Sequence, residues 1–99
     1  MADKVNTRFK LPILIFKEGK YFVAYSSALD LSTSGRNYDE VKRRFNEVVE
    51  ILFQELIQKK TLEEVLRSLG WQKIRRQWQP PLIIAQEYVS INFPALEKV

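Results

Sequence analysis

The first third of the chain is dominated by β-branched and aromatic residues that alternate with polar ones. Residues 9–17 (FKLPILIFK) and residues 20–26 (KYFVAYS) have the composition of two strands, and the short glycine-containing connection between them predicts a hairpin. Pro12 has no N–H to donate to a sheet, so the first strand is expected at an edge or with an irregularity. Residues 29–34 alternate apolar and polar side chains before Gly35, which predicts a third, half-exposed strand.

The spacing of apolar residues then changes to steps of three and four. Over residues 38–58 this spacing predicts one long amphipathic helix. Asn37 is suited to the N-cap position, and Glu40 stands three residues later, as in a capping box. A second, shorter helix is predicted over residues 61–69, because Gly70 follows its last apolar position and is typical of a helix C-terminus.

The last element that the pattern predicts is a strand at residues 87–93 (EYVSINF). Pro80 and Pro81 forbid a helix before it, and its apolar and polar residues alternate cleanly. The predicted order is therefore β-β-β-α-α-β in a single α+β domain spanning residues 1–99, with a three-stranded antiparallel sheet packed on one long helix. The C-terminal strand either returns to its own sheet or adds to that of a partner, and its expected oligomer-interface residues are Tyr88, Val89, Ile91 and Phe93.

The amino-acid composition excludes several kinds of catalytic and metal site. Ninety-nine residues suit one domain, and the chain has neither cysteine nor histidine, which removes disulfides, thiolate ligands and the commonest general acid or base. The strand region offers only Glu18 and Asp30 as carboxylates, and no glycine-rich phosphate loop is present. We therefore expect no enzyme activity, no metal and no cofactor. No apolar run has the length of a signal peptide or a membrane span, so a cytoplasmic protein is expected.

The positive charge is concentrated in one segment. The net charge is +4, and residues 58–78 contain six bases and two acids, which alone account for it. Nucleic-acid grooves combine such bases with stacking rings. The alternative, which we favour, is that both tryptophans pack under the helices while the bases are solvated, because small domains need large aromatics in their cores. The candidate nucleic-acid contacts are Lys59, Lys60, Trp71, Lys73, Arg75, Arg76 and Trp78.

The stretch from Lys20 to Leu52 resembles the HicB antitoxin family. The matching positions are Tyr21, Ala24, Leu29, Gly35, Asn37, Glu40 and Val41. The resemblance implies a partial ribonuclease-H-like fold, dimers or tetramers, and pairing with a small RNA-cleaving toxin. The chain departs from the family at Ser27 and Ala28, where proline is usual, and at Arg36, where an acidic residue is frequent. Residues 71–99 fit no helix pair, so we do not expect them to form the C-terminal DNA-binding extension that many members have.

Three functions remain open from the sequence. The first is a HicB-like antitoxin, or a solitary relative, that binds and occludes a small RNA-cleaving toxin. The second is a small nucleic-acid-binding module that uses residues 59–78. The third is a non-enzymatic oligomeric scaffold, and all three are compatible with a homodimer or a higher homo-oligomer.

Overall fold

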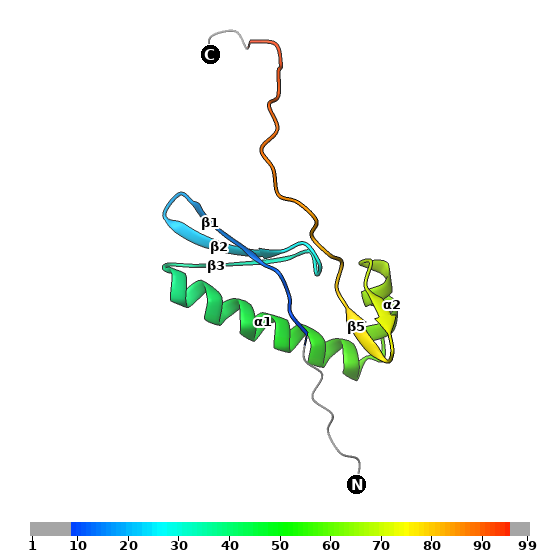
Figure 1. The fold of residues 1–99 in the computed structure, drawn as a ribbon. Helices are drawn as coiled ribbons and strands as arrows, with labels where there is room; N and C mark the ends of the chain where they lie inside the picture. Colours follow the sequence, from blue (N-terminus) through cyan, green and yellow to red (C-terminus); the bar gives the residue numbers. More distant parts are fainter. Residues whose placement is uncertain (1–8, 96–99) are drawn as a thin grey trace.

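A computed structural model describes residues 9–95 of the chain. Three strands, β1 (Leu14–Glu18), β2 (Tyr21–Ser26) and β3 (Leu31–Gly35), form one antiparallel sheet in the order β1-β2-β3 (Figure 1). The three predicted strands and the antiparallel sheet are therefore confirmed.

All three strands begin later than predicted, β2 by one residue and the other two by more. The first starts at Leu14 instead of residue 9, because Pro12 cannot donate a ladder hydrogen bond. The third starts at Leu31 instead of residue 29, because Asp30 adopts a left-handed conformation (φ 50°) in the turn before it.

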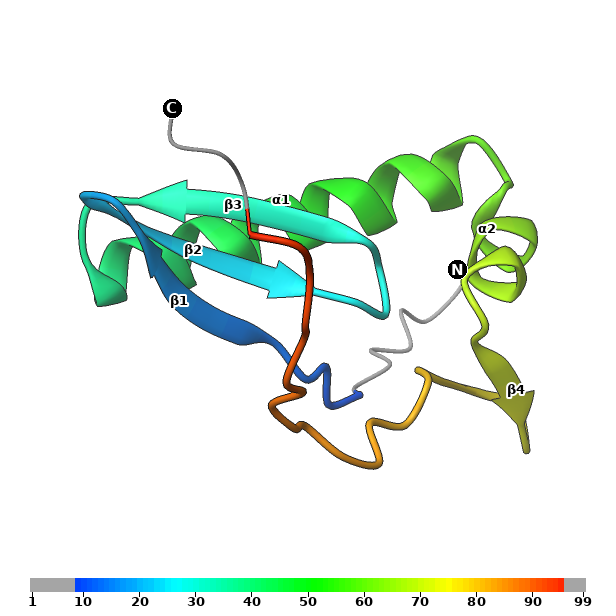
Figure 2. The same cartoon turned by 90° about the horizontal axis from the view of Figure 1, so that it is seen from above.

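The long helix α1 (Tyr38–Gln58) covers one face of the sheet, as predicted (Figures 1 and 2). Ala24 in β2 is fully buried there against Val41 and Phe45 of the helix. The cross-strand pairs Ile15–Ala24 and Ala24–Thr33 place alternate residues of all three strands on this covered face. On the opposite face, Leu14, Phe16 and Tyr21 are exposed among the residues that the structure describes.

The start of α1 is fixed by the two residues that the sequence identified. The Oδ1 of Asn37 accepts a hydrogen bond from the backbone N–H of Glu40 at 2.8 Å. In turn, the Glu40 carboxylate accepts one from the backbone N–H of Arg36 at 3.1 Å. These bonds satisfy two donors near the helix N-terminus, and they direct the chain from β3 into the helix.

We expect Asn37→Ala to lower the free energy of unfolding by about 0.5–2 kcal/mol, since the cap acceptor is lost. Urea unfolding followed by circular dichroism would measure the change. Asn37→Ser is the matched control, because serine keeps an acceptor at the cap and should lose much less. An alanine variant as stable as the unmodified chain would show that this bond does not hold the helix start.

A second core lies where the short helix α2 (Leu62–Ser68) meets the loop between β2 and β3. Leu66 is fully buried there with Ala28, Leu29 and Trp71. The second predicted helix is thus confirmed, one residue shorter at each end. Within residues 9–95, no helix is both long and apolar enough to cross a membrane.

A small hairpin follows α2. Strands β4 (Gln72–Ile74) and β5 (Gln77–Gln79) pair antiparallel, and the sequence did not predict them as strands. Their two-residue turn is Arg75-Arg76, with φ values of 52° and 68°. Two left-handed residues in a row are typical of a type I′ turn, which usually contains asparagine or glycine. The arginine pair therefore gave no turn signal in the sequence.

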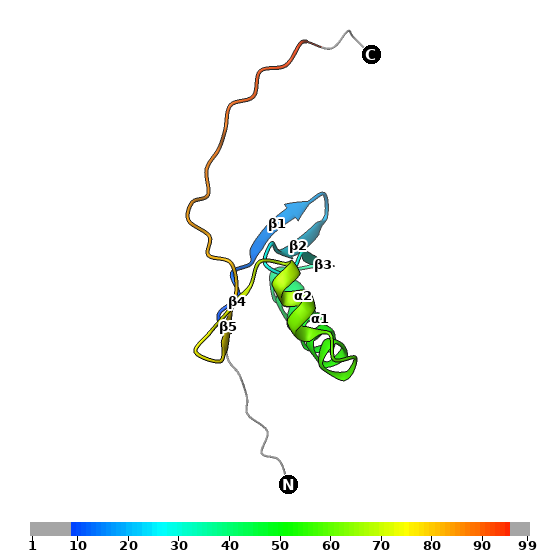
Figure 3. The same ribbon diagram turned by 90° about the vertical axis from the view of Figure 1, so that its right-hand side faces the viewer.

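The C-terminal segment after Pro81, here called the arm (residues 82–95), departs from the prediction. Residues 87–93 form no strand in this chain, and every residue of the arm is exposed. The arm rises away from the sheet (Figures 1 and 3). The arm lies beside no other strand of the described chain, so its backbone has no partner for ladder hydrogen bonds. Alternating side chains alone do not make a strand. The prediction of a strand added in cis is wrong for this structure, and addition to a partner stays a prediction.

Candidate protein-interaction site

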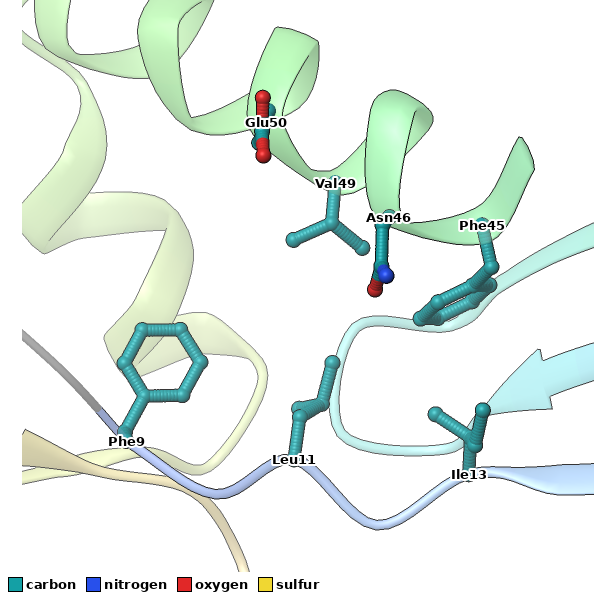
Figure 4. A pocket seen from close by; sticks show the side chains of 7 residues that line it. All are labelled: Phe9, Leu11, Ile13, Phe45, Asn46, Val49 and Glu50. Carbon is teal, nitrogen blue, oxygen red and sulfur yellow. The ribbon is translucent and has the colours of Figure 1, made fainter. Parts of the chain in front are cut away.

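An apolar groove lies between α1 and the segment that leads into β1. Its volume is about 440 Å³. Figure 4 shows Phe9, Leu11 and Ile13 pointing from the chain before β1 toward the helix, where Phe45 and Val49 point back at them. The lining is completed by two polar helix residues, Asn46 and Glu50. Most side chains that line the groove are therefore apolar, and the two polar ones both come from the helix.

The groove adjoins the unpaired edge of the sheet. Strand β1 pairs only with β2, so its outer edge has no neighbouring strand among the described residues. The other edge, at β3, is different: the Arg44 guanidinium donates a hydrogen bond to the backbone oxygen of Ser34 at 3.2 Å. Charged side chains across an edge are one way in which proteins block strand addition. Within residues 9–95, β1 is therefore the edge without such a side chain across it.

The open face of the sheet carries a second apolar surface. Leu14, Phe16 and Tyr21 are 41%, 45% and 56% exposed. They flank the half-buried Val23 and Tyr25, which share this face as the alternation of β2 predicted. We call these five residues the open-face patch.

Two carboxylates lie at the ends of the open-face patch. Glu18 follows Phe16 on the same face of β1, and Asp30 accepts a hydrogen bond from the Tyr25 hydroxyl at 3.4 Å. The structure places them beside an exposed apolar surface, which gives that surface an acidic border.

The predicted oligomer-interface residues all lie on the arm. Tyr88 is fully exposed, and Val89, Ile91 and Phe93 are each 70% exposed or more. Large apolar side chains in a row of this kind are unusual on a protein surface that binds nothing. The structure brings these residues together on one extended segment, but it shows no contact that tests their role.

The predicted nucleic-acid contacts do not form one surface. Trp71 is 2% exposed, and its indole N–H donates to the backbone oxygen of Ala28 at 2.8 Å, so its assignment as a contact was wrong. Lys59 pairs with Glu55 at 2.7 Å at the end of α1, and Lys60 is exposed in a left-handed conformation. The alternative prediction, that the tryptophans pack in the core, is confirmed for Trp71.

The remaining candidates gather on the β4–β5 hairpin. Trp78 is half-buried, and the charged groups of Arg67 and Lys73 lie 5.3 and 5.6 Å from its ring centre. Arg75 and Arg76 are exposed at the turn, and within residues 9–95 neither makes an ion pair. The hairpin therefore presents three cations, Lys73 and the two arginines, at one exposed tip.

The pKa values of two helix carboxyls are displaced. The backbone N–H of Arg36 lowers the pKa of Glu40, and Arg44 and Arg36 lower it further. The Lys59 ammonium, by hydrogen bond and by charge, lowers the pKa of Glu55. Both carboxylates lie near the ends of α1, and each is favoured in its charged form by these neighbouring groups of the chain.

Comparisons with family models, with curated proteins and with solved structures each find no match to this chain. The described residues also contain no group of three or more acidic side chains placed to hold a metal ion. The surfaces of the chain itself are therefore the basis for its proposed function.

The groove is the part of the site that sequence reasoning missed. A signal for it was present: Phe9, Leu11, Ile13 and Ile15 are apolar at every second position. The strand predicted over residues 9–17 contains this row, and that prediction did not say which side of the strand is buried. An apolar row of this kind can be covered by a neighbouring strand or left open as a groove. The local sequence pattern does not say which, because the answer depends on tertiary structure.

Proposed function

We propose that this chain is a non-enzymatic binding protein of the HicB-like antitoxin kind, which captures a small RNA-cleaving toxin and occludes its RNA-binding surface. The observation that carries the proposal is the open-face patch, whose large apolar side chains are exposed in the described chain. We further propose that the protein acts in the cytoplasm and as a homo-oligomer.

The border of the patch favours a basic partner. A surface that binds RNA carries lysine and arginine, because the phosphate backbone is negative. Glu18 and Asp30 flank the apolar residues of the patch and offer carboxylates to such a surface. Tyrosine is enriched at protein interfaces, and Tyr21 and Tyr25 both lie on this face. A chain of net positive charge can thus present a locally acidic face to a basic toxin.

Co-purification with the small protein encoded beside this gene tests the proposal. Phe16→Asp should weaken the measured affinity about tenfold or more, because a charge is placed at the centre of the patch. It should also restore RNA cleavage by that protein. Ile57→Asp is the matched control, since Ile57 is 59% exposed near the far end of α1. The proposal would be contradicted if the protein encoded beside this gene does not bind and keeps its ribonuclease activity. Equal binding of that protein by the Phe16→Asp and Ile57→Asp variants would also contradict it.

The β4–β5 hairpin favours nucleic-acid binding as a second candidate function. Arg75 and Arg76 are both held with positive φ, a conformation that L-residues adopt at a cost. Asparagine-glycine would form this turn with less strain. Arginines placed there instead, without ion pairs in the described chain and next to Lys73, present guanidinium groups that suit phosphates.

Fluorescence anisotropy with single-stranded RNA tests this second candidate. Binding should fall steeply between about 50 and 200 mM salt, and the triple change Lys73→Glu, Arg75→Glu and Arg76→Glu should weaken it about tenfold or more. A triple change of Lys10, Lys17 and Lys20 to glutamate is the control of equal charge. Binding that is absent, or lowered equally by both variants, would remove the hairpin as a nucleic-acid site.

A further inference from the structure

We propose that the arm of one copy adds as a fourth strand beside β1 of a second copy, and that its apolar residues fill the groove next to that edge. The second copy returns its own arm in the same way. This inference depends on the self-assembly stated above, and it names the donor segment and the acceptor edge of that assembly.

The acceptor has both features that strand addition requires. The outer edge of β1 presents backbone groups with no partner strand in the described chain. Next to the start of this edge, the groove lined by Phe9, Leu11, Ile13, Phe45 and Val49 offers apolar side chains to a strand that continues past β1 along residues 9–13 (Figure 4). A bound strand would thus gain hydrogen bonds along β1 and apolar contact in the groove.

The arm has the matching pattern. Val89, Ile91 and Phe93 alternate with Tyr88, Ser90 and Asn92, so a strand would present the first three on one side. Between residues 82 and 93 the only charged side chain is that of Glu87. Prolines stand immediately before and after this segment, at residues 80–81 and 94, and each lacks the N–H that a ladder needs. The part of the arm able to pair as a strand is therefore the part with alternating residues.

The length of the arm favours a second copy over the arm's own sheet. Pro80 to Ile83 lie beside Phe9 and Pro12, so an arm turning onto its own sheet would start level with Pro12. From Pro12 to Glu18 is six residues, about 20 Å, whereas from Ile83 to Phe93 is ten residues, about 33 Å.

Running forward along its own β1, the arm would carry Ile91 and Phe93 past the end of that strand and away from the groove. Reversing its direction would require a turn, and residues 82–93 contain neither glycine nor proline. The arm of a second copy has no such constraint and can lie with Val89 to Phe93 over the groove. Because donor and acceptor are on the same chain, a two-fold axis makes both contacts equivalent and closes the dimer.

Cross-linking between introduced cysteines in the full chain tests the exchange. The sequence has no native cysteine, so only the introduced ones can react. One double variant carries Ile91→Cys on the arm and Asn46→Cys in the groove. The matched control carries Ile91→Cys with Glu47→Cys, which is adjacent on α1 but lies in the polar pocket on the β3 side. Each is treated with a short bismaleimide and separated on a denaturing gel.

The proposal predicts linked dimers from the Asn46 pair, at least tenfold more than from the Glu47 pair. A fast-migrating linked monomer would show that the arm covers its own groove, and no preference between the pairs would show that it covers neither; both results overturn the proposal. Mixing the two single variants, Ile91→Cys and Asn46→Cys, adds a check because only exchange can link them. Toxin capture that depends on Phe16 would remain intact after such a failure, so the two proposals fail separately.

Discussion

Trp71→Ala is expected to lower the free energy of unfolding by about 3–5 kcal/mol, the range for removing a large aromatic residue from a core. Trp71 is 2% exposed in the core that joins α2 to the loop before β3. Its ring meets Phe9 edge-on at 5.1 Å and Phe53 at 6.3 Å between centres. Its N–H bond to Ala28 ties the end of α2 to a loop 43 residues earlier in the chain. The substitution removes all three contacts and leaves a cavity.

Urea unfolding at neutral pH measures the change, and Trp71→Phe is the matched control. Phenylalanine keeps much of the ring packing and loses the hydrogen bond, so it should lose clearly less stability than alanine. An alanine variant within about 1 kcal/mol of the unmodified chain would contradict a core role for this residue and reopen its use on the surface.

Gly35→Ala is expected to cost about 1–3 kcal/mol, as overpacking at a close contact typically does. A Cβ added at Gly35 would lie 2.8 Å from the backbone nitrogen of Val41 and 2.9 Å from its Cα. These are backbone atoms in the first turn of α1, so β3 and the helix would have to separate. Neither can do so freely, because Val41 is fully buried against Ala24.

Thermal and urea unfolding of Gly35→Ala would measure this loss, with Ser34→Ala as the control at the neighbouring exposed position. The control should change the free energy of unfolding by no more than about 0.5 kcal/mol. If both variants unfold alike, the close approach of β3 to α1 does not limit the packing here.

The elements that the sequence predicted well are those determined by local periodicity. The alternation along β2 separates Val23 on the open face from the buried Ala24, and the three-and-four spacing from Val41 to Leu56 defines the buried face of α1. The cap at Asn37 was equally readable, because a side-chain acceptor three residues before Glu40 is itself a local signal.

What the sequence did not reveal has two causes, an unusual turn and contacts between distant segments. The β4–β5 hairpin has a turn of two arginines whose positive φ values no propensity suggests. The arm has the alternation of a strand, yet pairing also needs an available edge, and the pattern alone does not say which chain provides it. The groove of the candidate site was missed for a similar reason, since it forms only where α1 packs beside residues 9–13.

The claim most central to this account is that the arm works by joining another chain. Sedimentation equilibrium of the full chain at micromolar concentration measures it directly, beside a variant with Val89, Ile91 and Phe93 all changed to serine. We predict twice the 11.7 kDa chain mass for the unmodified protein, and a single chain mass with an unchanged helical circular dichroism signal for the variant. A folded monomer for the unmodified chain, or a dimer that survives the three serines, would contradict the claim.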